Sequence, residues 1–356
     1  MSSTSIPSGQ RSARPSGKRS AKRVAGYGLL GGAMVAIAGI GGMKAAGRSV
    51  RAHHDRVLDD PLEPPADLVH HHLAGADGAV IHVVDTGGLG TPVVLLHGVT
   101  LQWWVWSAVI RLARPNHRVL AWDMRGHGES VAGTDGVTLE ACARDLEIVL
   151  SELDLTDAVI VGHSMGGMVL GRFALQAPSV LADRVCGVVF LATSGASVSL
   201  KGLSGGLVAL AGGVAGMARA GMARPRLAYQ WKPGDTSAAM VRFAFGAHPT
   251  ARMIDDVRKM LADMSSQSLA EAGASIAAHD VRRELAAVDV AAVVVVGDQD
   301  RLTPRGHAAV LNGQLADSEL RVLPGVGHQV MQEAPAAVVA AIERAAELGA
   351  ERRRTG

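Results

Sequence analysis

Aromatic side chains are scarce in this chain, since only 3% of its 356 residues are Phe, Trp or Tyr. Hydrophobic residues nevertheless make up 48% of the sequence, which is enough to bury a sizeable core. That core must be built mainly from Ala, Val, Leu and Met. The length fits one large domain or two smaller ones.

Cysteine is also rare, and the spacings typical of metal or redox sites are missing. Cys142 and Cys186 fall in a predicted helix and a predicted strand, so we interpret them as small buried hydrophobic residues. The sequence contains no C-x-x-C and no H-E-x-x-H. Residues 70–72 are three histidines, but neighbouring side chains on a strand point to opposite faces, which disfavours a common site. We predict no bound metal and no cofactor.

Acidic residues are absent before Asp55, whereas six basic residues lie between Arg11 and Arg23. Without these six, 29 of the 35 basic residues remain against 33 acidic residues, a balance of −4. The main body is therefore mildly acidic, and we expect no nucleic-acid partner.

Charged residues are then absent from residues 24–43, a Gly-rich apolar run. Residues 1–23 are predicted to be a disordered basic leader. The run itself is long enough for a single N-terminal membrane segment, with a secretory signal or a soluble or interfacial segment as alternatives. Its basic flanks weakly favour a cytoplasmic N-terminus and an external main body. Without the anchor, the protein would be cytoplasmic or secreted. Residues 44–65 are predicted to be a linker.

From residue 66 onwards the pattern is typical of an α/β domain, which we place at 66–350. Asp77 and Gly78 separate two short apolar runs and predict a β-hairpin. Continuous apolar runs then alternate with helical patterns, which indicates a mostly parallel sheet of about eight strands flanked by helices. The expected strands are 70–73, 80–84, 92–96, 118–122, 158–161, 185–192, 291–296 and 320–323, and the main expected helices are 102–113, 139–153, 167–175 and 335–348.

A stretch at about 196–285 shows helical spacing but no convincing strand. It is too long for one crossover connection, so we predict a helical lid over the carboxyl edge of the sheet. The alternative is an ordinary pair of crossover helices. Residues 351–356 are predicted to be a tail.

A candidate nucleophile, Ser164, lies in the sequence G-H-S-M-G (residues 162–166), between an apolar strand and a predicted helix. Such a turn lifts the serine hydroxyl out of the sheet, and Gly162 and Gly166 leave room for neighbouring backbone. A serine nucleophile needs a base, and the base needs an orienting acid. Asp298 and Asp300 both follow one predicted strand, and His328 follows the last one. Spacing alone does not choose between the two carboxylates.

Four motifs resemble the α/β-hydrolase fold superfamily over about residues 70–350. They are residues 95–99 (LLHGV), residues 123–130 (DMRGHGES), the Ser164 turn, and residues 297–304 (GDQDRLTP) followed by residues 327–328 (GH).

The resemblance implies a Ser164, His328 and Asp300 triad, with Asp300 as the acid. It also implies an oxyanion hole formed by the backbone N–H groups of Val99 and Met165. His97, beside Gly98, is expected to brace the oxyanion loop.

The predicted function is hydrolysis of carboxylic esters with apolar acyl groups, on a small-molecule substrate, because the expected lid is rich in Ala, Met and Gly. Alternatives within the same fold are a C–C bond hydrolase and a perhydrolase of the non-haem haloperoxidase type. An alternative of another class is a hydrolase-like receptor that binds a ligand without turnover. A serine at position 164 argues against epoxide hydrolases and haloalkane dehalogenases, which resemble this chain but use Asp there.

Overall fold

A computed structural model describes residue 45, residues 63–197 and residues 235–355. The leader at 1–23, the candidate membrane segment at 24–43 and most of the linker lie outside the described residues. Within the described ranges, no helix is long and apolar enough to cross a membrane.

The centre of the fold is an eight-stranded sheet with the order β1-β2-β4-β3-β5-β6-β7-β8. The pairs β1–β2 and β2–β4 are antiparallel, and every other pair is parallel. The strands are β1 Val69–Ala74, β2 Val80–Asp85, β3 Thr91–Leu96, β4 His117–Asp123, β5 Ala158–His163, β6 Val185–Leu191, β7 Ala291–Gly297 and β8 Ser318–Leu323. The predicted fold class, including the N-terminal hairpin, is confirmed.

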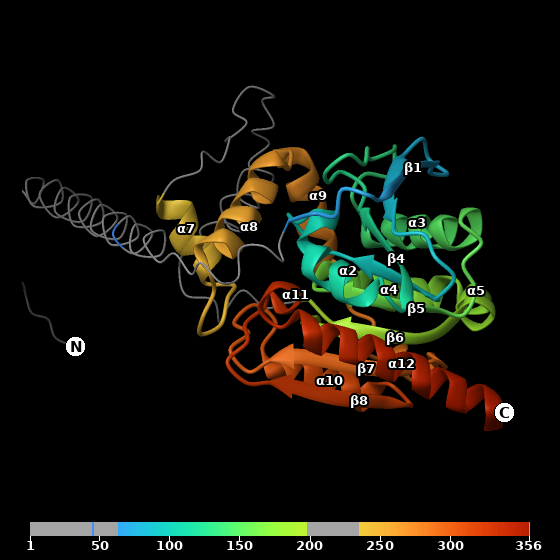
Figure 1. The fold of residues 1–356 in the computed structure, drawn as a ribbon. Helices are drawn as coiled ribbons and strands as arrows, with labels where there is room; N and C mark the ends of the chain where they lie inside the picture. The colour runs from blue at the N-terminus through green and yellow to red at the C-terminus, as the bar shows by residue number, and fades with distance from the viewer. Residues whose placement is uncertain (1–44, 46–62, 198–234, 356) are drawn as a thin grey trace, which may run out of the picture.

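Helices cover both faces of the sheet (Figure 1). One face packs against α3 and α4, and the other packs against α2 and α12. Strands β5, β6 and β7 are buried along their whole length, which explains their continuous apolar sequences. The helical elements outside the insertion are η2 Trp103–Trp106, α2 Ser107–Ala113, α3 Leu139–Glu152, α4 Met165–Gln176, α5 Pro178–Arg184, η4 Leu285–Ala287, α10 Arg305–Gln314, α11 Val330–Glu333 and α12 Pro335–Thr355.

The closing helix is longer than the sequence predicts. Residues from 351 were expected to form a tail, but α12 continues to Thr355. Three arginines occupy its last turn, where cations favour the helix dipole. Arg352 also pairs with Asp289 and Asp317, which ties this turn to the body of the domain.

The stretch between β6 and β7 holds the helices α7 Asp235–Arg242, α8 Ala251–Asp263 and α9 Ser266–Ala278. Its residues 198–234 lie outside the described part. The turn after α7 contacts the loop before His328, because Ala244 O accepts a hydrogen bond from His328 N at 2.7 Å. Figure 1 shows α7 and α8 together on one side of the sheet, near α2 and α11. The described helices α7 and α8 therefore lie beside the loops that follow the parallel strands.

Candidate active site

Ser164 occupies a strained turn between β5 and α4. Its φ of 51° and ψ of −115° lie where non-glycine residues rarely occur. Surrounding hydrogen bonds hold this conformation: Ser164 N donates to Leu191 O at 3.0 Å, and Thr193 Oγ1 donates to Ser164 O at 2.6 Å. The side chain is half-buried, so the hydroxyl remains within reach of a substrate.

Two glycines of the motif allow the turn to approach neighbouring backbone. A Cβ atom added to Gly162 would lie 2.6 Å from Gly166 O, and one added to Gly166 would lie 2.4 Å from Leu96 O. Both distances are far below van der Waals contact. Glycine is therefore required at both positions, as the motif predicts.

The carboxylate of Asp300 and the imidazole of His328 are in direct contact, with Oδ2 and Nδ1 2.9 Å apart. Oδ1 of Asp300 also accepts the backbone N–H groups of Leu302 at 2.8 Å and Thr303 at 2.9 Å. Oδ2 accepts the Thr303 hydroxyl at 2.8 Å. Asp300 is therefore held by donors on every side.

Burial acts to raise the pKa of Asp300, but the nearby His328 and the hydrogen bonds from His328 and Thr303 outweigh it and lower the pKa below its ordinary value. An ionised carboxylate only accepts hydrogen bonds, so the proton of neutral His328 must lie on Nδ1. The second ring nitrogen, Nε2, then carries a lone pair and is available as a base.

The other candidate acid, Asp298, has a different environment. It is exposed, and its Oδ1 accepts the N–H of Gly325 at 2.7 Å. This contact closes a turn in the loop that leads to His328. Of the two carboxylates that spacing leaves open, Asp300 is the one in contact with the imidazole.

His163 joins the nucleophile turn to the histidine loop. Its Nε2 donates to the carbonyl oxygen of His328 at 2.9 Å, and the two rings pack with centroids 4.8 Å apart. Since Ser164 is the next residue in the chain, this bond brings the hydroxyl and imidazole into the same region. Among the described residues, Ser164 Oγ and His328 form no direct hydrogen bond. Catalytic contacts of this kind often tighten only when substrate is bound.

Glu333 in α11 also holds the loop that carries His328. Its carboxylate accepts the N–H of Gly327 at 3.1 Å and of Gly246 at 2.7 Å. It thereby links the residue before His328 to the insertion. Burial raises the pKa of Glu333, although these N–H donors act in the opposite direction.

Three contributors to the site were missed in the sequence: Thr303, Glu333 and the bridging contact of His163. Thr303 could have been found, because a Thr three residues after an Asp is a recognisable local hydrogen-bonding pattern. No short-range pattern connects Glu333 or His163 to the backbone atoms that they bind.

The loop after β3 carries the predicted oxyanion donor Val99 to the nucleophile. A Cβ atom added to Gly98 would lie 3.1 Å from Ser164 Cβ, so the Gly98 backbone lies close against the Ser164 side chain. Within the described part of the chain, no residue accepts the N–H of Val99 or Met165. The role of these two N–H groups as oxyanion donors stays a prediction.

His97 and His127 brace this loop. Nδ1 of His97 donates to Gly98 O at 2.8 Å, while its Nε2 accepts the N–H of Met124 at 3.0 Å. Nε2 of His127 accepts the N–H of Thr100 at 3.3 Å, and Thr100 has a positive φ of 68°. Burial lowers the pKa of His97 to about 3 and lowers that of His127 as well, so both rings stay neutral.

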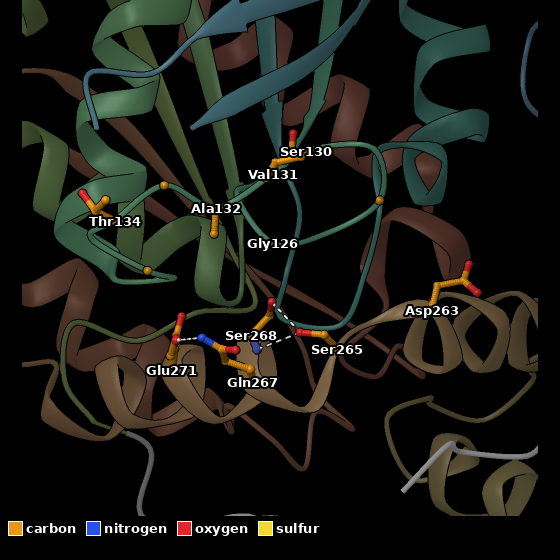
Figure 2. A pocket seen from close by; sticks show the side chains of 13 residues that line it. Gly126, Ser130, Val131, Ala132, Thr134, Asp263, Ser265, Gln267, Ser268 and Glu271 are labelled. Carbon is orange, nitrogen blue, oxygen red and sulfur yellow. Dashed lines mark hydrogen bonds between the residues drawn. The ribbon is translucent and has the colours of Figure 1, made fainter. Parts of the chain in front are cut away.

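A polar hollow of about 450 Å³ lies next to this region, between the loop 126–136 and the start of α9 (Figure 2). Figure 2 shows Ser265 bonded to Ser268 and Gln267 bonded to Glu271 along its floor. None of the three triad candidates lines it. The hydrogen-bond geometry around Ser164, and not the size of this hollow, identifies the candidate active site.

Residues 93–341 match the Alpha/beta hydrolase family. The chain is 30% identical over 270 residues to a Pseudomonas putida protein, the dihydrolipoyllysine-residue acetyltransferase component of an acetoin cleaving system, covering 73% of this chain and 65% of that protein. It is 35% identical over 146 residues to bifunctional epoxide hydrolase 2 of Sus scrofa, covering 39% of this chain and 25% of that protein. The chain thus spans less than two thirds of the length of either relative.

The fold is also similar to that of a thermophilic esterase from Thermogutta terrifontis. The two structures superpose with a TM-score of 0.63 at 25% identity, over 78% of this chain and 97% of the esterase. The family match at 93–341 contains the Ser164 turn, the Asp300–His328 pair and the oxyanion loop. By its sequence and its fold, the chain belongs to the alpha/beta hydrolase family.

Proposed function

We propose that this hydrolase cleaves carboxylic esters with apolar acyl groups through an acyl-enzyme on Ser164. The observations that carry the proposal are the hydrogen-bonded Asp300–His328 pair and the strained backbone of Ser164. The similarity to a solved esterase supports the same reaction class.

In this mechanism, His328 Nε2 takes the hydroxyl proton as Ser164 Oγ attacks the ester carbonyl. The negative charge that develops on the carbonyl oxygen is stabilised by the N–H groups of Val99 and Met165. Collapse of the tetrahedral intermediate breaks the bond to the alcohol oxygen, and His328 returns the proton to the departing alcohol. Water then attacks the acyl-enzyme by the same steps in reverse order, releasing the acid.

Asp300 holds the imidazole in the required tautomer and stabilises the imidazolium that forms twice in each cycle. The preference for apolar acyl groups rests on the apolar composition of the insertion. Its helix α8 contacts the segment that follows the oxyanion loop, since Gln102 N donates to Met260 Sδ at 3.2 Å.

The test is a panel of p-nitrophenyl esters of increasing acyl length, measured with the wild-type protein and with Ser164→Ala. We expect turnover that rises with acyl length and is abolished in the variant. A fluorophosphonate probe should label the wild type and not Ser164→Ala. Labelling without ester turnover would instead favour a C–C bond hydrolase or a perhydrolase of the same fold. Absence of labelling would favour a receptor without turnover.

We also propose that residues 24–43 anchor the protein to a membrane. The support is the length of this uncharged run, which matches the thickness of a bilayer core. The full-length protein should sediment with membranes and be released by detergent, whereas a chain that starts at Asp60 should remain in the supernatant. Equal partitioning of the two proteins would contradict the anchor.

A further inference from the structure

A cluster of imidazole and carboxylate groups lies on β1 and β2, outside the candidate active site. Side chains two residues apart on a strand share a face, so His70 and His72 project together while His71 projects to the other side. In the antiparallel pairing, His72 lies opposite His82 of β2. The pairing thus adds a histidine from the neighbouring strand, which the spacing along β1 alone does not reveal.

His70 and His82 are in direct contact, with Nδ1 of His70 2.9 Å from Nε2 of His82. Glu129, in the loop after β4, completes the group, because the candidate ligand atoms of these three residues all lie within 4.8 Å of one another. His72 is adjacent, with Nε2 3.8 Å from a Glu129 carboxylate oxygen.

A hydrogen bond to Asp123 selects the tautomer of His82. Nδ1 of His82 lies 2.9 Å from Asp123 Oδ2, and both side chains are buried. Asp123 also accepts the N–H groups of Trp103 at 2.9 Å and Glu129 at 3.0 Å. Because the carboxylate accepts all three bonds, His82 carries its proton on Nδ1. The lone pair on Nε2 therefore points towards His70 and Glu129.

An imidazole that donates from one nitrogen to a buried carboxylate and presents the other to further ligands is the usual arrangement around protein-bound transition metals. Two imidazoles and one carboxylate favour ions such as Zn²⁺ or Co²⁺ over Mg²⁺ and Ca²⁺. We propose that His70, His82 and Glu129 bind one divalent transition-metal ion, with His72 or water as a fourth ligand.

The geometry requires only small adjustments. Zn–N bonds of about 2.0–2.1 Å in a tetrahedron set ligand atoms roughly 3.3 Å apart. The His70–His82 pair must open slightly, and the Glu129 carboxylate must approach. Both movements are available, since His70 is exposed and the Glu129 side chain is 62% exposed. His82, the fully buried member, already points at the site.

The bound ion would connect the edge hairpin to the loop 123–130. That loop also supports the oxyanion loop through the His127–Thr100 contact. No residue of the cluster touches Ser164, Asp300 or His328 within the described part of the chain. The role we assign to the ion is therefore to hold the loop, not to act on the substrate.

The test uses the full-length protein without an affinity tag, treated with EDTA and dialysed. Zn²⁺ is titrated by calorimetry, and Co²⁺ by its visible absorption. His70→Gln removes an imidazole ligand while its amide can still donate to His82, and Glu129→Gln removes the carboxylate charge. His71→Gln is the matched control, because His71 lies on the same strand but faces Asp85, 3.5 Å away.

We expect one ion per chain, with the absorption of tetrahedral Co²⁺ and a higher Tm when Zn²⁺ is present. Loss of an outer partner of a metal ligand typically weakens binding about 10–100-fold, so loss of a ligand in either variant should weaken it at least tenfold. His71→Gln should bind like the wild type. The proposal is overturned if no ion binds at millimolar concentration, or if His70→Gln and His71→Gln bind equally well.

Discussion

Replacement of Asp300 by Asn tests the proposed triad most directly, because the structure dictates how the amide must orient. Oδ1 of Asp300 accepts two backbone N–H groups, whereas Oδ2 faces the Thr303 hydroxyl and His328 Nδ1. An amide nitrogen at the Oδ1 position would leave the buried N–H of Thr303 and the half-buried N–H of Leu302 without an acceptor, and a buried N–H in that state costs about 1–3 kcal/mol. The amide nitrogen is therefore expected at the Oδ2 position, where the hydroxyl of Thr303 can rotate and accept.

In that orientation the amide introduced by Asp300→Asn donates to Nδ1 of His328, which must accept. The imidazole proton then moves to Nε2, and the base that should activate Ser164 is lost. A triad with the wrong tautomer typically loses ~10⁴ in kcat, equivalent to about 5 kcal/mol in the barrier. Stability should change much less, by no more than about 3 kcal/mol for one charged hydrogen bond.

The assay is kcat for a p-nitrophenyl ester, with Tm measured on the same samples. Asp298→Asn is the matched control, because it alters a carboxylate two residues away that binds only Gly325 N among the described residues. Its kcat should stay within a few-fold of the wild type. The proposed triad is refuted if Asp300→Asn keeps more than a tenth of the activity, or if the control loses as much.

Three further predictions concern the surroundings of the triad. Gly98→Ala places a Cβ atom 2.9 Å from His163 Nδ1 and 3.1 Å from Ser164 Cβ, so the oxyanion loop must shift. We expect kcat to fall about 10²–10³-fold, as it does when one oxyanion donor is lost. The circular dichroism spectrum should remain unchanged. Glu333→Gln leaves one buried N–H without its acceptor, so the unfolding free energy measured by urea denaturation should fall by about 1–3 kcal/mol. The same variant should have a lower kcat and an unchanged KM. The third concerns pH. Burial lowers the pKa of His97 to about 3 and that of His163 well below its ordinary value. The unfolded chain therefore binds protons below about pH 6.5 that the folded chain does not. Above that pH the unfolding free energy should not depend on these two rings, and below it the free energy should fall by up to about 1.4 kcal/mol per pH unit for each ring. Urea titrations at pH 7.5 and pH 5 that give equal unfolding free energies would contradict this prediction.

Much of the fold can be predicted because it depends on local patterns. The β5 strand is a short run of buried apolar residues, and its sequence alone distinguishes it from the amphipathic helix α3 that precedes it. Other features depend on contacts between distant segments. The first turn after the oxyanion loop is the 3₁₀ helix Trp103–Trp106, and its start is bonded to Asp123 on the next strand. The last turn of α12 is held by acidic residues that precede it by 35 residues or more.

The amino-acid sequence by itself predicts the family, the Ser164 turn and the order of the triad candidates. The turn can be predicted because the sterics of a strand–turn–helix unit, and its need for glycine, are local. Spacing leaves Asp298 and Asp300 both open, since they follow the same strand, and the family resemblance favours Asp300; only the folded chain shows Asp300 in contact with His328. Folding also brings His163 to the carbonyl of His328, 165 residues away, and His82 to His70 across a strand pair. Hydrogen bonds and metal sites depend on atoms within about 3 Å of each other, and packing, not spacing along the chain, sets those distances.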